Sequence, residues 1–316
     1  MEDRLRRWIR DDFGLDVIEL TRIDHGADAA ATVWQARTAT EPRQYAVKWS
    51  GGGTGAALQT TAYLAANNIP GVPSPVTTTT GELWSEHEGK RLSLTPWIPG
   101  TRAAASGLTT DQWTSYGALL GRVHALEPPP ALVAALPPLN PINARMPSLA
   151  RSIEHRLRTE PPADSLEADL ARIWEANQKT ITALLDLAAD LEPPNGPRVI
   201  CHADPHLGNV LVDPSTIHLI DWDDAVLAPR EQDLLFMLGG MGSLGPTTHE
   251  QRRAFFQGYG EVTIDRTRLT YYRCARALED VALWSEQALQ GPDREDCLEI
   301  LRDALGPDGL AVRTLS

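Results

Sequence analysis

The stretch from Val199 to Phe236 contains the residues whose types and spacing could do chemistry. Short β-branched runs alternate there with polar side chains that can act on a proton or hold a metal ion, which is unusual for a purely structural segment. Asn209 follows Asp204 by five positions, and a second carboxylate, Asp221, comes directly after another apolar run. One carboxylate can orient a hydroxyl group, while an amide oxygen and a second carboxylate can hold a hard cation such as Mg²⁺. The order and spacing of these three residues therefore predict phosphoryl transfer.

Three short apolar runs must bring these side chains together. Residues 199–201 read as one buried strand, which delivers Asp204 just beyond its end. Residues 210–212 and 217–220 read as two more strands. The four residues between them are a turn signal, because proline presets a backbone dihedral and Asp or Ser can bond its own backbone. We expect this hairpin to place the amide beside the second carboxylate.

The motif resembles that of a known family of enzymes. Residues 202–209, His-Ala-Asp-Pro-His-Leu-Gly-Asn, are similar to the His-Gly-Asp-Leu-His-Pro-Gly-Asn stretch of the aminoglycoside phosphotransferase family, whose members share the protein-kinase-like fold. Residues 219–224 and 227–234 resemble the spectinomycin phosphotransferase branch in particular. The resemblance is specific in this core and covers most of the chain more weakly. Pro205 and Leu207 depart from the commoner residues, which affects the shape of the loop more than its chemistry.

The resemblance implies an α+β fold with two lobes, like that of protein kinases. Residues 1–98 would form a nucleotide-binding lobe around an antiparallel sheet, with the inter-lobe hinge at its end. Residues 99–316 would form a mainly helical lobe that holds the catalytic and substrate-binding residues. The sequence agrees with this division, since strand-like runs dominate before Gly100 and helical patterns follow it, including one over residues 166–191.

By the same resemblance the protein is an enzyme that transfers the γ-phosphate of ATP or GTP to a hydroxyl group of a small molecule. Asp204 would accept or orient the hydroxyl proton, and Asn209 and Asp221 would coordinate Mg²⁺. His202 would support the catalytic loop through hydrogen bonds rather than transfer protons. One of the two acids that follow Trp222, Asp223 or Asp224, could hydrogen-bond to a metal ligand without contacting the metal itself.

A lysine and a loop of small residues lie where the resemblance places the triphosphate. Lys48 lies in the run 45–49, the third predicted strand, which in kinases carries the lysine that holds the α- and β-phosphates. The loop 25–31 joins the first two strands, and its small side chains let backbone N–H groups approach phosphates closely. The loop residues that we assign to the nucleotide are Gly26, Asp28 and Ala29.

Residues 94–100 resemble the inter-lobe hinge of the family, where main-chain groups bond adenine. By that alignment the carbonyl of Pro96 and the N–H of Ile98 would be the adenine partners. A proline can serve at the first position because only its carbonyl is needed. A plain strand that ends in a Pro-Gly turn fits the same residues.

The helix after the third strand departs from the family pattern. It normally supplies a glutamate that pairs with the strand lysine, yet no acid occurs from Trp49 to Tyr63, where Gln59 is the only long polar side chain inside the helix. Gln59 could accept a weaker bond from Lys48, another element could supply the carboxylate, or the enzyme could be impaired. A non-catalytic protein that holds a nucleotide or a drug therefore stays an alternative.

The net charge and the acids Glu279 and Asp280 bear on the class of substrate. The formal net charge of −13 argues against nucleic acid or an anionic membrane as partner and suits a cationic small molecule, although many proteins are acidic for solubility alone. Glu279 and Asp280, with Trp284 one turn later, could line a site for such a ligand together with Asp204, or could form an ordinary half-exposed helix face. We expect an aminoglycoside or aminocyclitol antibiotic, whose phosphorylation would confer resistance. Related kinases that act on choline, homoserine, other metabolites or macrolides keep those substrates open.

The composition is that of an ordinary globular protein, with 42% hydrophobic and 22% charged residues. No apolar run is long enough to span a membrane, and the N-terminus has no signal-peptide core, so we expect a cytoplasmic protein, a monomer or weak homodimer. Its three widely spaced cysteines indicate reduced thiols.

One alternative enzyme class uses the same residues differently. His202, Asp204 and His206 could hold zinc or manganese in a hydrolase, which would leave Lys48 without a use.

Overall fold

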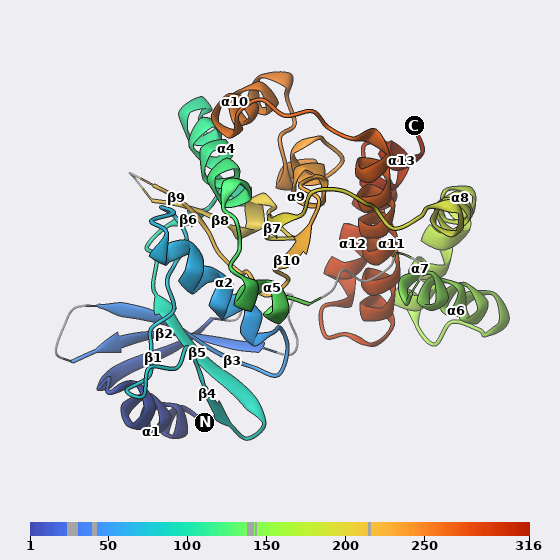
Figure 1. The fold of residues 1–316 in the computed structure, drawn as a ribbon. Coiled ribbons are helices and arrows are strands. Elements are labelled where there is room, and N and C mark those ends of the chain that lie inside the picture. The colour runs from blue at the N-terminus through green and yellow to red at the C-terminus, as the bar shows by residue number, and fades with distance from the viewer. Residues whose placement is uncertain (24–30, 40–42, 138–141, 143, 214–215) are drawn as a thin grey trace.

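The computed structural model describes residues 1–23, 31–39, 43–137, 142, 144–213 and 216–316. An antiparallel sheet with one covering helix forms the N-terminal part, and helices form most of the rest (Figure 1). The predicted α+β fold is therefore confirmed. The lobe boundary at residue 98 stays a prediction, although the last strand of the large sheet ends at Pro96.

The N-terminal sheet has five antiparallel strands. Their order across the sheet is β1 (Val17–Ile23), β2 (Ala31–Thr38), β3 (Gln44–Ser50), β5 (Lys90–Pro96) and β4 (Ser85–His87). Helix α1 (Glu2–Phe13) buries Leu5, Ile9 and Phe13, which recur at helical spacing and so form one apolar face. These side chains join buried residues of the strands, such as Val47 and Leu94, in a core of their own. This core fixes β3, the strand that carries Lys48.

Helix α2 (Gly55–Ala66) connects β3 to the rest of the chain and lies between the sheet and the helical part (Figure 1). Its buried Ala56 and Leu64 belong to the core of the C-terminal part rather than to that of the sheet. Gly71, shortly after the helix, accepts the N–H of Leu219 through its carbonyl at 2.8 Å. The two parts of the chain are thus in direct contact behind the site.

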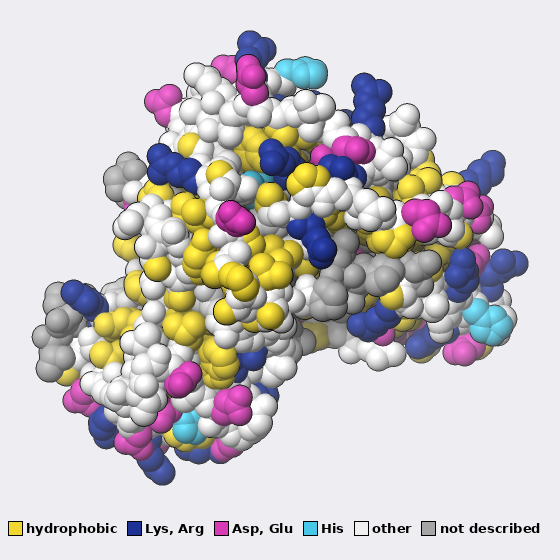
Figure 2. All heavy atoms as spheres, viewed as in Figure 1, with side chains coloured by type: hydrophobic (Ala, Val, Ile, Leu, Met, Phe, Trp, Pro, Cys, Tyr) yellow, Lys and Arg dark blue, Asp and Glu magenta, His cyan; other side chains and the backbone are white. Residues whose placement is uncertain are grey.

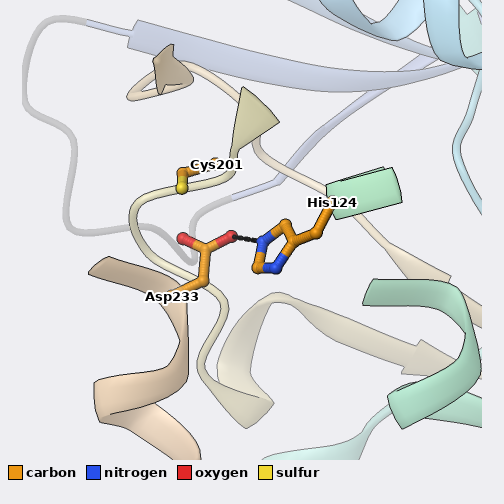
Figure 3. A group of neighbouring side chains, drawn as sticks. All are labelled: His124, Cys201 and Asp233. Carbon is orange, nitrogen blue, oxygen red and sulfur yellow. Dashed lines mark hydrogen bonds and ion pairs between the residues drawn. The ribbon is translucent and has the colours of Figure 1, made fainter. Parts of the chain in front are cut away.

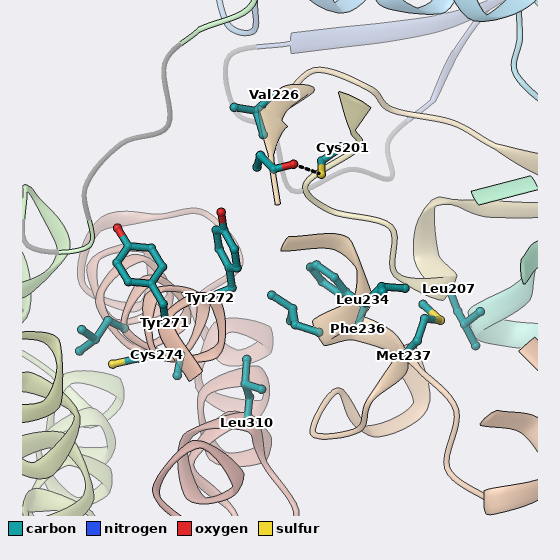
Figure 4. Close-up of a cluster of buried hydrophobic side chains, with 14 of the residues drawn as sticks. Cys201, Leu207, Val226, Leu234, Phe236, Met237, Tyr271, Tyr272, Cys274 and Leu310 are labelled. Atoms are coloured by element: carbon teal, nitrogen blue, oxygen red, sulfur yellow. Dashed lines mark hydrogen bonds between the residues drawn. The ribbon is translucent and has the colours of Figure 1, made fainter. Parts of the chain in front are cut away.

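Long helices surround the C-terminal core, and α11 (Arg266–Gln290) is the longest. The helices packed with it are α6 (Met146–Thr159), α7 (Ser165–Ala176), α8 (Gln178–Asp190), α12 (Arg294–Leu305) and α13 (Leu310–Leu315). Phe236, Tyr271 and Tyr272 are almost fully buried where α11 meets the segment after the short helix α9 (Glu231–Leu234) (Figure 4). The segments that hold the catalytic loop therefore rest on a rigid apolar base.

Glycines allow a close contact between α4 (Thr110–Ala125) and α10 (His249–Tyr259). A Cβ atom added at Gly117 would lie 1.9 Å from the carbonyl oxygen of Phe255, and one added at Gly258 would lie 1.8 Å from that of Thr114. The two backbones can approach this closely only because both glycines lack side chains.

Two small sheets position the predicted motif. Strand β7 (Val199–Cys201) pairs with β10 (Val226–Ala228), and β8 (Val210–Val212) pairs with both β6 (Thr101–Arg102) and β9 (Ile217–Leu219). The hairpin of β8 and β9 is the predicted one. The other short elements are α3 (Ala103–Ser106), α5 (Pro130–Ala135) and the 3₁₀ turns Leu207–Asn209, Leu235–Met237 and Gly242–Leu244.

The long helical pattern over residues 166–191 is helical in the structure but is not continuous. Two helices, α7 and α8, occupy this range, and they separate at Asn177. The side-chain amide of Asn177 donates to the carbonyl of Ile173 at 2.8 Å, which satisfies a terminal carbonyl of α7 and ends that helix.

None of the helices in the described ranges is both long and apolar enough to cross a membrane. Acidic and basic side chains are scattered over the face seen in Figure 2, and neither sign dominates it. Hydrophobic side chains gather near the middle of this face, where α5 lies in Figure 1. The negative net charge is therefore not gathered into one patch on this side of the molecule.

Candidate active site

The catalytic loop begins directly after β7, where the backbone turns sharply. Ala203 has a positive φ of 72°, a conformation that L-residues adopt only when their surroundings hold them there. Asp233, which follows the short β10 strand, accepts both the N–H of His202 (2.9 Å) and that of Ala203 (2.7 Å). These two bonds fix the turn that presents Asp204.

Asp233 is the centre of a buried group behind this loop. Its Oδ2 atom lies 3.0 Å from Nε2 of His124 on α4, as Figure 3 shows, and Tyr259 bonds the other nitrogen of His124 at 2.8 Å. Cys201 lies beside them, and its thiol donates weakly to the carbonyl of Ala228 (3.5 Å). Burial raises the pKa of Cys201 well above its usual value, so the thiol stays protonated. The group is a hydrogen-bonded brace, because its ligand atoms are already paired.

His202 lies in the interior and is bonded to the backbone on both sides of the loop. Its Nε2 donates to the carbonyl of Ile220 (2.9 Å), its Nδ1 accepts the N–H of Asp204 (3.2 Å), and its ring packs on Trp222 at 4.6 Å between centroids. Both ring nitrogens are therefore used by the backbone. A zinc or manganese site that includes His202 does not fit this geometry.

Asp204 is held from three directions. Asn209 donates to its Oδ2 (3.3 Å) and to its carbonyl (3.0 Å), His206 approaches Oδ2 at 3.2 Å, and Arg276 of α11 donates to Oδ1 at 2.6 Å. Burial raises the pKa of Asp204, but the charge of Arg276 and the bond from His206 outweigh burial and hold this pKa well below its usual range. At neutral pH the side chain is a fixed carboxylate.

The β8–β9 hairpin brings Asn209 and Asp221 to the same end of the small sheet. The carbonyl of Asn209 accepts the N–H of Ile220 at 2.9 Å, so Asp221 is the next residue along. Asp221 has a positive φ of 63°, and its side chain is 48% exposed. An amide oxygen and an open carboxylate are ligands that suit Mg²⁺. These two residues would hold the cation, whose charge would offset that of the phosphates.

Lys48 reaches from β3 into this site. Its Nζ atom lies 3.0 Å from Oδ1 of Asp221 and 2.8 Å from Oδ2 of Asp223. Burial lowers the pKa of Lys48, but the two carboxylates outweigh burial and raise this pKa well above its usual value, so the ammonium group stays charged. Gln59 is exposed on α2. The partner of Lys48 that the sequence left open therefore comes from another element, the segment after β9.

The model of the phosphotransferase enzyme family matches residues 19–278 of this sequence. The chain belongs to this family. It is a phosphotransferase with a kinase-like fold, and the family resemblance stated from the sequence is confirmed. A search of curated proteins returns no match.

Solved structures similar to this phosphotransferase cover nearly its whole length. Spectinomycin phosphotransferase APH(9)-Ia in complex with ADP and spectinomycin is 26% identical with a TM-score of 0.89, and the match covers 99% of this chain and 97% of that one. The AMP-bound complex of the same protein is 25% identical with a TM-score of 0.85, covering 99% and 98%. Ethanolamine kinase of Plasmodium vivax, 13% identical with a TM-score of 0.62, covers 100% and 89% and shares the fold alone.

Three of the predicted nucleotide contacts of the phosphotransferase, Gly26, Asp28 and Ala29, lie outside the described residues. Pro96 ends β5, opposite Tyr45 of β3, and Ile98 follows it in the segment that leads to β6. The N–H of Trp97 is bonded to the carbonyl of Gln44 at 2.9 Å, which holds the backbone of this segment to the start of β3. The adenine contacts stay a prediction.

Arg276 is the residue of this phosphotransferase site that the sequence analysis missed. Besides Asp204, it binds Asp280 through Nε at 2.9 Å, and its guanidinium lies over the ring of Phe236 at 5.3 Å. Burial raises the pKa of Asp280, and that of Glu279 as well, and Arg276 opposes both shifts. One of the predicted substrate acids, Asp280, is thus linked to Asp204 through an arginine. The spacing of Arg276 and Asp280 on one helix could have drawn attention to that arginine.

Trp284, the third predicted substrate residue on α11, lies against the apolar core. It is half-buried and packs against the C-terminal core. Its predicted contact with substrate stays a prediction, as does that of Glu279.

Proposed function

We propose that this enzyme transfers the γ-phosphoryl group of ATP or GTP to a hydroxyl group of a small cationic molecule of the aminoglycoside or aminocyclitol class. The observation that supports the proposal best is the position of the Asp204 carboxylate. It is bonded to Asn209, whose carbonyl accepts the N–H of Ile220 directly before Asp221, and Asp221 is the carboxylate that contacts Lys48. The order of these groups is the one that phosphoryl transfer needs.

The residues have separate roles in the proposed reaction. Asp204 orients the attacking hydroxyl and accepts its proton. Lys48 holds the phosphates of the nucleotide, while Asn209 and Asp221 hold Mg²⁺, which neutralises charge on the phosphates when bound. Asp233 does not contact the reacting groups but keeps the Asp204 turn in place through its two backbone bonds. Because this transfer involves little covalent chemistry by the protein, position and charge supply most of the catalysis.

A surplus of carboxylates beside Asp204 supports a cationic acceptor. The charges of Asp280, Asp224 and Asp204 act on Glu279, and the positive charge of Arg276 opposes them. Acidic side chains thus outnumber the arginine in this cluster, which would favour a positively charged acceptor. The likeness to spectinomycin phosphotransferase, whose complex contains ADP and spectinomycin, points to the same class of acceptor.

The test is a Mg²⁺-dependent turnover assay with ATP and GTP against aminoglycosides, spectinomycin, macrolides, choline, ethanolamine and homoserine. We expect turnover with an aminoglycoside or aminocyclitol, and a loss of kcat of about 10²- to 10⁴-fold in Asp204→Asn, which keeps the shape of the side chain but cannot accept the proton. Glu86→Gln, at an exposed position of β4, is the control.

The outcomes of this assay separate the alternatives. Turnover of choline, homoserine or a macrolide alone would replace the proposed acceptor class. Nucleotide binding without turnover of any acceptor would favour a non-catalytic binding protein. Equal kcat in Asp204→Asn and wild type would contradict the role of Asp204.

A further inference from the structure

The segment that follows Lys48 in the N-terminal part has no carboxylate that could pair with the lysine. No Asp or Glu occurs between Trp49 and Gly81, so α2 and the loops on both sides of it are without acids. The long polar side chain of α2, Gln59, is exposed. A lysine that must hold phosphates in one place needs a fixed partner, because its four-carbon stem is otherwise flexible.

Two carboxylates of the segment after β9 contact Lys48, and they differ in their surroundings. Asp221 is 48% exposed in its side chain and is the carboxylate best placed to hold a divalent cation, while Asp223 is 31% exposed. Asp223 also makes the shorter contact with Nζ, 2.8 Å against 3.0 Å. When the cation takes Asp221, Asp223 is the partner that Lys48 retains.

The loop between β3 and α2 is shaped around Asp223. Gly53 has a positive φ of 64°, and a Cβ atom at this position would lie 2.7 Å from Oδ2 of Asp223, the oxygen that binds Lys48. Arg91 of β5 holds the same loop by donating to the carbonyl of Gly52 at 2.6 Å. The backbone therefore passes close to the carboxylate, which only a residue without a side chain permits.

We propose that Asp223 is the positioning residue for Lys48 and replaces the acid that α2 lacks, while Asp221 is the exchangeable partner that the cation takes. The inference rests on the nucleotide binding proposed above. Because Lys48 belongs to β3 and Asp223 follows β9, this ion pair joins the N-terminal sheet to the C-terminal part. The lysine is then aligned by the contact between the two parts and not by the position of α2.

A double-mutant cycle on nucleotide binding tests the proposal. The variants are Asp223→Asn, Lys48→Met and the double variant, and calorimetry measures their affinity for ATP, once with Mg²⁺ and once with EDTA. Glu86→Gln is the control, since it removes one negative charge from an exposed position of β4. No acceptor is present, so a wrong assignment of the acceptor leaves the result unchanged. Circular dichroism and thermal unfolding verify that each variant is folded.

We expect Asp223→Asn to weaken ATP binding by about tenfold or more, the effect of one lost charge-assisted hydrogen bond, both with Mg²⁺ and with EDTA. The same change in the Lys48→Met background should weaken binding less than about twofold, because the partner is already absent. Glu86→Gln should leave the affinity for ATP within about twofold of wild type.

Four results would overturn the proposal. Equal losses in the wild-type and Lys48→Met backgrounds would mean that Asp223 does not act through the lysine. A loss that disappears with EDTA would make Asp223 a metal ligand instead. An affinity of Asp223→Asn within about twofold of wild type would remove its role altogether. Wild-type protein that binds neither ATP nor GTP would overturn the proposed function as well as this inference.

Discussion

At the scale of single residues, Arg276 is the group that connects the catalytic carboxylate to the acids of α11. It contacts Asp204 at 2.6 Å and Asp280 at 2.9 Å, and its own side chain is only 20% exposed. Charges that are this well shielded from water depend on their partners. Removing the arginine takes an ion-pair partner from Asp280 and leaves Asp204 with Asn209 and His206 alone.

We expect Arg276→Met to lower the free energy of unfolding by about 2 kcal/mol and kcat by about tenfold to hundredfold, because Asp204 loses the contact that fixes its orientation. Arg276→Lys keeps the charge but cannot bind both carboxylates through a planar fork, so its values should lie between those of wild type and Arg276→Met. Denaturant titration and steady-state kinetics measure the two effects. Wild-type kcat in Arg276→Met would contradict the expectation.

The residues that the sequence identified correctly as neighbours are those joined by short loops. Asp204 and Asn209 share one loop, and Asp221 follows a hairpin whose turn residues are easily recognised, so local rules suffice to bring them together. Arg276 contacts Asp204 across 72 positions, and Lys48 contacts Asp223 across 175. Such contacts depend on how whole elements pack, and a single sequence carries no local pattern for them.

At the scale of elements, the glycine contact between α4 and α10 supports the brace behind the catalytic loop. His124 of α4 and Tyr259 of α10 are bonded to each other, and His124 is bonded to Asp233. The spacing between the two helices therefore affects the residue that holds the Asp204 turn.

Gly117→Ala should lower the free energy of unfolding by about 1–3 kcal/mol, despite the higher helix propensity of alanine, because the new Cβ would lie 1.9 Å from the carbonyl oxygen of Phe255. Ser115→Ala, on the exposed face of the same helix, is the control and should leave stability nearly unchanged. Denaturant unfolding of both variants measures the difference in their free energies of unfolding. Equal stability of Gly117→Ala and Ser115→Ala would show that the helices can separate without cost.

Most elements could be predicted from the sequence because their apolar residues recur at the period of a helix or a strand. Helix α1 and the strands of the large sheet are examples. The break between α7 and α8 was not predicted, since apolar residues continue on both sides of Asn177 and only the hydrogen bond of its side chain ends the first helix. Polar residues that bond their own backbone can thus override a continuous pattern.

At the scale of the whole molecule, the net charge of −13 should assist the approach of a cationic acceptor. Raising NaCl from 50 to 500 mM should increase the KM of such an acceptor by about fivefold, since the screening length falls to a few ångströms. The KM of the anionic nucleotide should not rise in the same way and is the internal control. An acceptor KM that is independent of salt would show that only close contacts matter.

The ion pair between Lys48 and the segment after β9 also bears on inhibition of this enzyme. A compound that works by displacing the helix after β3 can inactivate a kinase whose lysine partner is on that helix. Here the 2.8 Å contact is made by Asp223, which a movement of α2 does not remove. Selective inhibitors should instead be sought among compounds that wedge between β3 and the Asp-Trp-Asp segment, where they would separate the lysine from both of its carboxylates.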